Sequence, residues 1–205
     1  MSQLDTQMQA FVQRSLKCYP TDAVESSAAD QRRWYDALCE EFSVPRPQGI
    51  VVTNGFVQAP DGHQVPIRRY QVGTQASNVQ IIYAHGGGFV VGGLDSHDDI
   101  CAELAHQSGL DLLAVDYRLA PEFNYPDDIN DCLTVVDWLL ADGHQFILAG
   151  DSAGGTLCAC VANARCQLTS SQLLGQVLIY PALVQGVETP SMVEHAFAPL
   201  LSRAD

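Results

Sequence analysis

The stretch FILAGDSAGG at residues 146–155 decides the fold. Its four apolar residues run into the pattern G-x-S-x-G centred on Ser152, and a helix-forming segment follows. This spacing is typical of a strand that turns sharply into a helix with the serine at the apex, and Gly150 and Gly154 fit the turn because side chains there would collide. Amide N–H groups at a helix N-terminus favour developing negative charge, so Ser152 is a candidate nucleophile for acyl transfer.

The surrounding sequence decides between a catalytic serine and an incidental serine on a glycine-rich turn. The run HGGGF at 85–89 directly follows the apolar segment 79–84, which is predicted to be a buried strand. Glycines after a strand let backbone N–H groups turn toward a substrate oxygen, and a tetrahedral oxyanion needs such donors within about 3 Å. The candidate oxyanion-hole donors are the N–H groups of Gly87, Gly88 and Ala153.

His85 lies within the glycine turn itself, although a histidine so close to a candidate nucleophile invites assignment as the general base. We interpret it as a supporting residue that bonds to nearby backbone, because a base must reach the serine hydroxyl. Gly86 and Asp151 are assigned the same supporting role.

With these residues the chain resembles the hormone-sensitive-lipase-like family of α/β-hydrolases, whose marks are H-G-G-G, Y-R-L-A-P-E and G-D-S-A-G-G. The three motifs stand here at 85–88, 117–122 and 150–155, and the resemblance extends from about Val51 to the last residue. It implies a mostly parallel central sheet with flanking helices and a helical lid. It also implies hydrolysis of carboxylic esters through an acyl-enzyme, with the loop at 117–122 supporting the site from beneath.

Length and composition indicate one soluble domain, or one domain with a small lid, that binds a neutral small molecule. The chain has 205 residues, 47% hydrophobic content and a net charge of −14. This charge argues against nucleic acid and anionic membrane surfaces as partners. No apolar run is long enough to span a bilayer, and the N-terminus has no basic and apolar signal pattern, so a cytoplasmic location is expected.

No metal or cofactor is expected. The seven cysteines are odd in number and, without an export signal, are interpreted as free thiols. The run His97-Asp98-Asp99 could be imagined as metal ligands, but helix-start chemistry explains it more simply, with Ser96 as N-cap of a helix through His106.

Two amphipathic helices are predicted before the sheet, at residues 2–17 and 22–42, and prolines at 45 and 47 close this region. We therefore divide the chain into an N-terminal helical lid, 1–49, and an α/β-hydrolase core, 50–205. The resemblance gives such helices a place over the serine, while two helices simply packed on the core explain the pattern equally well.

From residue 50 the pattern alternates strands with helices, which predicts a mainly parallel sheet with right-handed crossovers. An antiparallel hairpin comes first, because two β-branched runs flank the turn sequence at 59–62. The predicted strands are 50–58, 64–72, 79–84, 110–117, 145–149 and 175–180, and the later helices are 96–106, 127–140 and 153–168.

The end of the chain departs from the family. The triad order is serine, then acid, then histidine, and the resemblance places acid and base after later strands. After Ser152 the chain has one histidine, His195, and one aspartate, Asp205, while residues 189–205 resemble a lid insertion. We therefore expect the C-terminal strands, acid and base to be missing. His195 with Glu188 would have a legal order, but both lie in the lid-like segment, so an exposed helix position is expected for His195 instead.

Three functions are therefore carried forward. The first is a serine carboxylesterase acting on short- to medium-chain esters, for which an inactive chain is one expectation because the triad acid and histidine are absent. The second is a non-catalytic protein that binds small ligands on the same scaffold, and the third is an amidase. A last expectation concerns the strand at 175–180, whose outer partner is absent in this interpretation, so the chain can self-associate through an open sheet edge.

Overall fold

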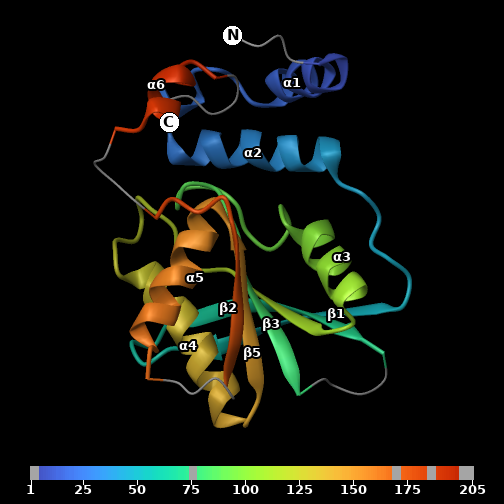
Figure 1. Ribbon diagram of the computed structural model, residues 1–205, viewed down its shortest axis with the longest axis vertical. Coiled ribbons are helices and arrows are strands. Elements are labelled where there is room, and N and C mark those ends of the chain that lie inside the picture. Colours follow the sequence, from blue (N-terminus) through green and yellow to red (C-terminus); the bar gives the residue numbers. More distant parts are fainter. Residues whose placement is uncertain (1–4, 74–77, 168–171, 184–187, 199–205) are drawn as a thin grey trace. The chain divides into compact units, whose positions relative to one another are not determined.

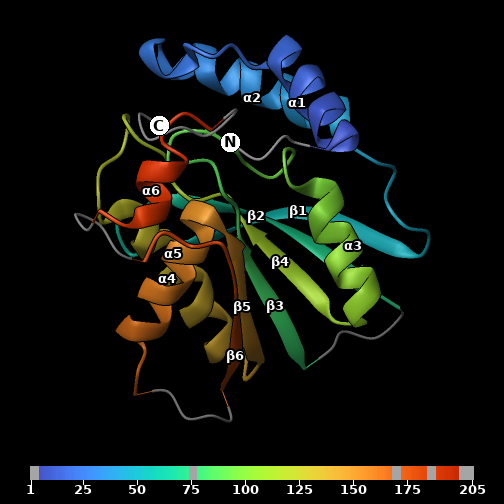
Figure 2. The same cartoon turned by 45° about the horizontal axis from the view of Figure 1, so that its top comes forward.

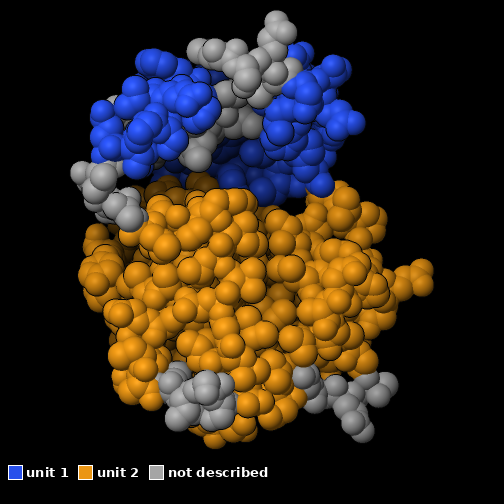
Figure 3. All heavy atoms as spheres, viewed as in Figure 1, with its two compact units in different colours: residues 1–42, 184–205 blue, residues 43–183 orange. Residues whose placement is uncertain are grey.

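The computed structural model describes residues 5–73, 78–167, 172–183 and 188–198 (Figures 1 and 2). Contacts within the chain divide it into two units, which Figure 3 colours separately. Unit 1 combines residues 1–42 with 184–205, and unit 2 holds residues 43–183. The sheet and all three sequence motifs belong to unit 2.

Unit 2 is built on a six-stranded sheet with the strand order β1-β2-β4-β3-β5-β6. The strands are β1 (Ile50–Gln58), β2 (Gln64–Val72), β3 (Val79–Ala84), β4 (Asp111–Val115), β5 (Gln145–Asp151) and β6 (Leu173–Ile179). β1 and β2 form an antiparallel hairpin, and β2 also pairs antiparallel with β4. From β4 through β3 and β5 to β6 all pairings are parallel, which confirms the predicted α/β fold class.

Helices cover both faces of this sheet (Figure 1): α3 (Asp98–Ser108) packs on one face, and α4 (Asp127–Ala141) and α5 (Ser152–Ala164) pack on the other. Successive residues of a strand point to opposite faces of the sheet, so β3 contributes side chains to two hydrophobic cores. Ile82 joins the core formed with α4 and α5, whereas Ile81 and Tyr83 join the core formed with α3. Burial on both faces explains why this strand is a continuous apolar run.

The predicted helix from 22 to 42 is wrong at its start. The chain forms a single 3₁₀ turn, η1 (Ala23–Glu25), and then begins a separate helix, α2 (Ala28–Phe42). Ser27 Oγ accepts a hydrogen bond from the Asp30 N–H at 3.2 Å and donates one to Asp30 Oδ2 at 2.8 Å. The serine thus satisfies an amide of the first turn, and this capping starts the new helix.

Two other helix ends also differ from the prediction. The N-cap residue of α3 is His97, whereas Ser96 Oγ bonds to Gly93 and to the His97 ring. The two aspartates that follow do lie in the first turn, as predicted. α5 ends at Ala164, short of the predicted residue 168, which lies outside the described residues. Within the described ranges, no helix is long and apolar enough to cross a membrane.

Unit 1 contains α1 (Thr6–Cys18), α2 and α6 (Pro190–Glu194). The Phe11 and Phe42 rings pack at 4.9 Å between centroids, and Arg14 pairs with Glu41 at 2.9 Å. These contacts hold α1 against α2. The predicted role of the N-terminal helices as a lid over the serine stays a prediction.

β6 is the last strand of the sheet and pairs only with β5 among the described residues. Its exposed side chains include Leu174 and Val177, with 45% and 51% of their surface accessible. The pairing with β5 contains an irregularity next to Phe146. In the described part of the chain, one edge of the sheet is therefore open along β6.

Candidate active site

The predicted strand–turn–helix around Ser152 is present. Ser152 directly follows β5, is the first residue of α5, and has a φ of 49°, a left-handed conformation that non-glycine residues rarely adopt. A Cβ at Gly150 would lie 2.6 Å from Ala84 O, and one at Gly154 would overlap the same oxygen. The glycines therefore allow the end of β3 to approach the turn, and the fixed turn imposes the strained backbone on the serine.

The glycine turn lies beside this elbow because β3 and β5 are parallel neighbours. Their register pairs Ala84 with Gly150, so the two chains leave the sheet at the same edge. Gly87 has a φ of 117°, and its carbonyl accepts hydrogen bonds from the N–H groups of Val90 and Val91, each at 3.0 Å. A side chain at Gly87 would overlap the backbone of Val91. Only glycine fits this tight turn.

The three predicted oxyanion donors come from these two turns. Among the described residues, the N–H groups of Gly87 and Gly88 donate no hydrogen bond to another part of the chain. Gly88 has a φ of 59°, and the space where its Cβ would lie is empty. Ala153 is the second residue of α5, where helical N–H groups have no acceptor one turn earlier in the helix. Their predicted role as donors to an anionic oxygen near Ser152 stays a prediction.

Asp151 ties the two turns together. Its Oδ1 accepts hydrogen bonds from Tyr83 Oη at 2.8 Å and from the Gly86 N–H at 2.9 Å, and His97 Nε2 lies 3.4 Å away. Burial alone would raise the pKa of the Asp151 carboxyl, but these three donors outweigh it and hold the pKa below its usual value. A Cβ at Gly86 would overlap the carboxylate, so this position too requires glycine.

His85 is buried and bonded to backbone. Its Nδ1 lies 2.7 Å from Gly86 O, and because a carbonyl oxygen only accepts, Nδ1 carries the proton. The ring stacks on Tyr117 at 4.4 Å between centroids, and Tyr117 Oη donates to the His85 carbonyl at 2.7 Å. Burial, with a smaller effect of His97, lowers the pKa of His85 to about 4. The ring is therefore neutral at pH 7 and holds the shape of the turn.

The loop that carries the Y-R-L-A-P-E motif, residues 117–122, is anchored by Arg118. Its guanidinium lies 2.8 Å from the fully buried carboxylate of Asp131 on α4, and 2.9 Å from Asp61 in the β1–β2 turn. The Ala120 N–H donates to Phe89 O at 2.9 Å, which joins this loop to the glycine turn. Removing one partner of such a buried pair leaves an uncompensated charge, so these contacts tie the loop to α4 and to the β1–β2 turn.

A family model described as the alpha/beta hydrolase fold matches residues 81–205, which include all three motifs. The chain belongs to this family. Within it, relatives place the chain among the hormone-sensitive-lipase-like esterases. The chain is 32% identical over 198 residues to the ethyl acetate hydrolase of Pseudomonas putida. It is also 39% identical over 134 residues to the esterase LipI of Mycobacterium tuberculosis.

Solved structures agree with this assignment. The hyperthermophilic esterase of the archaeon Pyrobaculum calidifontis superposes with a TM-score of 0.85 and 27% identity over 98% of this chain and 67% of its own. The match to the Pseudomonas enzyme covers 90% of this chain and 61% of that enzyme, and the match to LipI covers 62% and 42%. The chain thus spans between 42% and 67% of the length of these relatives.

All six histidines of the chain lie in the described residues, and none of them forms a hydrogen bond with Ser152 Oγ there. The two histidines of the motif region, His85 and His97, are engaged with Gly86 and with Asp151. His195 is exposed at the C-terminal end of α6, as predicted, and belongs to unit 1. A general base for the serine is therefore not in place among these residues.

Sequence reasoning missed one residue of this site. It assigned His97 to the start of a helix, but its side chain is only 4% exposed and lies against Asp151. The signal in the sequence was weak, because Ser96, Asp98 and Asp99 are all good helix-start residues and made a surface position plausible. Only the fold brings the start of α3 next to the end of β5.

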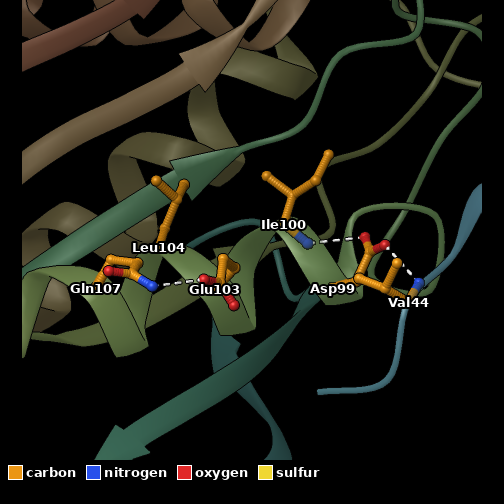
Figure 4. A pocket seen from close by; sticks show the side chains of 6 residues that line it. All are labelled: Val44, Asp99, Ile100, Glu103, Leu104 and Gln107. Atoms are coloured by element: carbon orange, nitrogen blue, oxygen red, sulfur yellow. Dashed lines mark hydrogen bonds between the residues drawn. The ribbon is translucent and has the colours of Figure 1, made fainter. Parts of the chain in front are cut away.

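A separate cavity of about 340 Å³ lies on the outer side of α3 and contains no motif residue (Figure 4). Its polar side chains bond locally: Asp99 accepts from the N–H groups of Ile100 and Val44, and Gln107 donates to Glu103. In the described residues, no group of three or more His, Cys, Asp or Glu side chains could hold a metal ion.

Proposed function

We propose that the protein is a serine hydrolase that cleaves carboxylic esters through an acyl-enzyme. The observation that carries the proposal is the position of Ser152, held at a φ of 49° at the start of α5 beside the glycine turn. The names of the relatives, an ethyl acetate hydrolase and two esterases, support an ester as the substrate. Neutral short- to medium-chain esters suit the net charge of −14 best.

In this mechanism Ser152 Oγ attacks the ester carbonyl carbon while its proton passes to a base. The carbonyl oxygen becomes an oxyanion, which accepts hydrogen bonds from the N–H groups of Gly87, Gly88 and Ala153. The intermediate collapses, the bond to the alcohol oxygen breaks, and the alcohol leaves with the proton from the base. Water then attacks the acyl carbon of the acyl-enzyme while the base takes its proton. The bond to Ser152 Oγ breaks, the serine regains a proton from the base, and the carboxylic acid is released.

The scheme requires a base, because a serine without one is a weak nucleophile at neutral pH. We propose that the acid and the histidine come from polypeptide of the kind that makes the relatives longer, and not from His195. The oxyanion donors alone can leave residual catalysis of about 10³-fold over water. The chain by itself is then a slow esterase, and a cytoplasmic location remains part of the proposal.

A second candidate is a protein that binds small ligands without turning them over. It is favoured by one observation, the lack of a histidine on Ser152 Oγ among the described residues. The donors of the two turns would then hold a ligand oxygen without covalent chemistry. An amidase would use the same residues, and matched ester and amide substrates separate it from an esterase.

The test is covalent labelling of the purified chain by an organophosphonate ester, followed by peptide mapping. Labelling of Ser152, with none in the Ser152→Ala variant, is expected, because the phosphonyl oxygen occupies the place of the oxyanion. Hydrolysis of p-nitrophenyl acetate above the buffer rate should vanish in the same variant. Binding of the ester with neither labelling nor turnover would establish the second candidate and overturn the first.

A further inference from the structure

We propose that His97 is a positioning residue, which holds the Asp151 carboxylate and thereby fixes the glycine turn and the serine elbow at the spacing that oxyanion binding needs. This inference rests on the proposed function for its catalytic consequence. It begins from a burial that helix-start chemistry does not explain, because only 4% of the surface of His97 is exposed. Most buried side-chain polar atoms have a hydrogen-bond partner, so the contacts of both ring nitrogens are informative.

The two ring nitrogens of His97 have different neighbours. Nδ1 lies 2.9 Å from Ser96 Oγ, and that hydroxyl also bonds to Gly93 O and to the Gly93 N–H. The hydroxyl has one proton, which it donates either to Gly93 O or to Nδ1, and when it donates to Nδ1 the proton of the ring lies on Nε2. Nε2 lies 3.4 Å from Asp151 Oδ1, and an ionised carboxylate only accepts. Asp151 is therefore the acceptor at this contact, and His97 donates to it in the tautomer that carries the proton on Nε2.

Three donors converge on this one carboxylate oxygen from three parts of the chain. Tyr83 comes from β3, Gly86 from the glycine turn and His97 from the start of α3. Asp151 directly precedes Ser152, and Gly86 directly precedes Gly87. The carboxylate is therefore the link between the nucleophile and the first candidate donor of the oxyanion hole.

Peptide planarity carries this link to the Gly87 N–H. In a trans peptide the C=O of one residue and the N–H of the next point in opposite directions. The peptide between His85 and Gly86 is held at both ends, by Tyr117 Oη on its C=O and by Asp151 on its N–H. The next peptide is held at Gly86 O by His85 Nδ1, which directs the Gly87 N–H the other way. A shift of Asp151 would therefore turn the Gly87 N–H away from its direction.

The pair of variants His97→Gln and His97→Asn separates this role from simple filling of space. The glutamine amide nitrogen can take the place of Nε2 and donate to Asp151, whereas the asparagine amide reaches only the place of Nδ1 near Ser96. Both are neutral and polar. His106→Gln is the matched control, because His106 is exposed in the last turn of the same helix.

Two measurements on the full chain decide the proposal. The first is the pair of backbone amide resonances of Gly86 and Gly87 by NMR, which does not depend on activity. The second is the Ser152-dependent kcat and KM for p-nitrophenyl acetate. His97→Asn should move both resonances and lower kcat about 10- to 100-fold with KM within about twofold, because a displaced catalytic donor affects the transition state most. His97→Gln should restore most of both.

The outcomes distinguish this inference from the proposed function. If the wild-type chain shows no Ser152-dependent turnover, the proposed function fails and the resonances alone decide the role of His97. Resonances and kcat that are the same in His97→Asn as in the His106→Gln control would overturn the inference. Equal losses in the glutamine and asparagine variants would also overturn it, because packing and not the bond to Asp151 would then be responsible.

Discussion

β5 and β6 lie side by side in the sheet, yet they are held in different ways. β5 pairs with β3 on one side and β6 on the other, and most of its residues are buried. β6 pairs with β5 alone among the described residues, and four of its seven residues, Leu173, Gly175, Leu178 and Ile179, are only partly covered while the rest are exposed. The strand that leads into Ser152 is thus paired on both sides, while its neighbour is paired on one.

This difference indicates where the chain tolerates substitution of a glycine by a larger residue. At the end of β5 each glycine faces backbone of another element, so geometry leaves no freedom. In β6, the Gly175 position has open space around it. The site is therefore specified by close contacts that a single methyl group would break, and the edge is specified mainly by its backbone pairing.

The largest expected effect comes from giving β6 a second neighbour. A chimera that adds the later strands, acid and histidine of a longer family member after Asp205 should hydrolyse short p-nitrophenyl esters at least about 10³-fold faster than the chain alone. Steady-state kinetics of both proteins, each with its Ser152→Ala control, measure the ratio. Comparable rates would mean that the base is already present in the chain and would return His195 to consideration.

The next effect compares a glycine at the site with one at the edge. Gly154→Ala should destabilise the chain by about 3 kcal/mol or more, because its Cβ would overlap the carbonyl of Ala84. Gly175→Ala should change the free energy of unfolding by less than about 1 kcal/mol, since its Cβ would meet no atom within 4 Å. Urea unfolding followed by circular dichroism gives both values. Equal destabilisation would show that the site is no more tightly specified than the edge.

A smaller effect is expected for association through β6. We propose that the open edge lets two copies of the chain pair, because unpaired backbone groups beside apolar side chains invite a further strand. Val177→Lys places a charge on a residue that is 51% exposed, and it should weaken self-association about tenfold. Sedimentation velocity over a concentration series would measure it, with Gln176→Lys as a control on an already polar, exposed position. A wild-type chain that stays monomeric at all concentrations contradicts the proposal.

The smallest effect concerns the strained backbone of the elbow. Ser152→Gly should stabilise the chain by about 1 kcal/mol, because glycine adopts a positive φ without the steric cost that serine bears at 49°. Ser152→Ala keeps that cost and should leave stability nearly unchanged. Both variants lose the nucleophile, so thermal unfolding separates strain from chemistry. A glycine variant that is less stable than the alanine variant would argue against strain at this position.

The sequence predicts the elbow and the sheet well because the responsible contacts are local or periodic. The turn around Ser152 requires its own glycines, and the alternation of apolar strands and amphipathic helices sets the α/β fold. The break before α2 could also have been found, since Ser27 and Asp30 form a serine–x–x–acid capping pattern.

His97 could not be placed in the same way, because its partner Asp151 is distant in the sequence. Helix-start chemistry explains a histidine next to two aspartates, and no periodicity marks it as buried. The parallel order β4-β3-β5 brings the start of α3 beside the end of β5, and this proximity exists only after the chain folds. The same holds for the bond between Arg118 and Asp131, which joins a loop to the helix behind it.

The division of the chain into two units has a consequence for its synthesis. Unit 2 is continuous, so its strands and helices can fold as they emerge from the ribosome. Unit 1 combines residues 1–42 with residues 184–205. Before the second segment is made, the first is stabilised only by its own contacts, such as the exposed pair of Arg14 and Glu41, which contributes at most about 1 kcal/mol. The helices made first are therefore expected to be completed last, so the nascent chain folds its middle before its beginning.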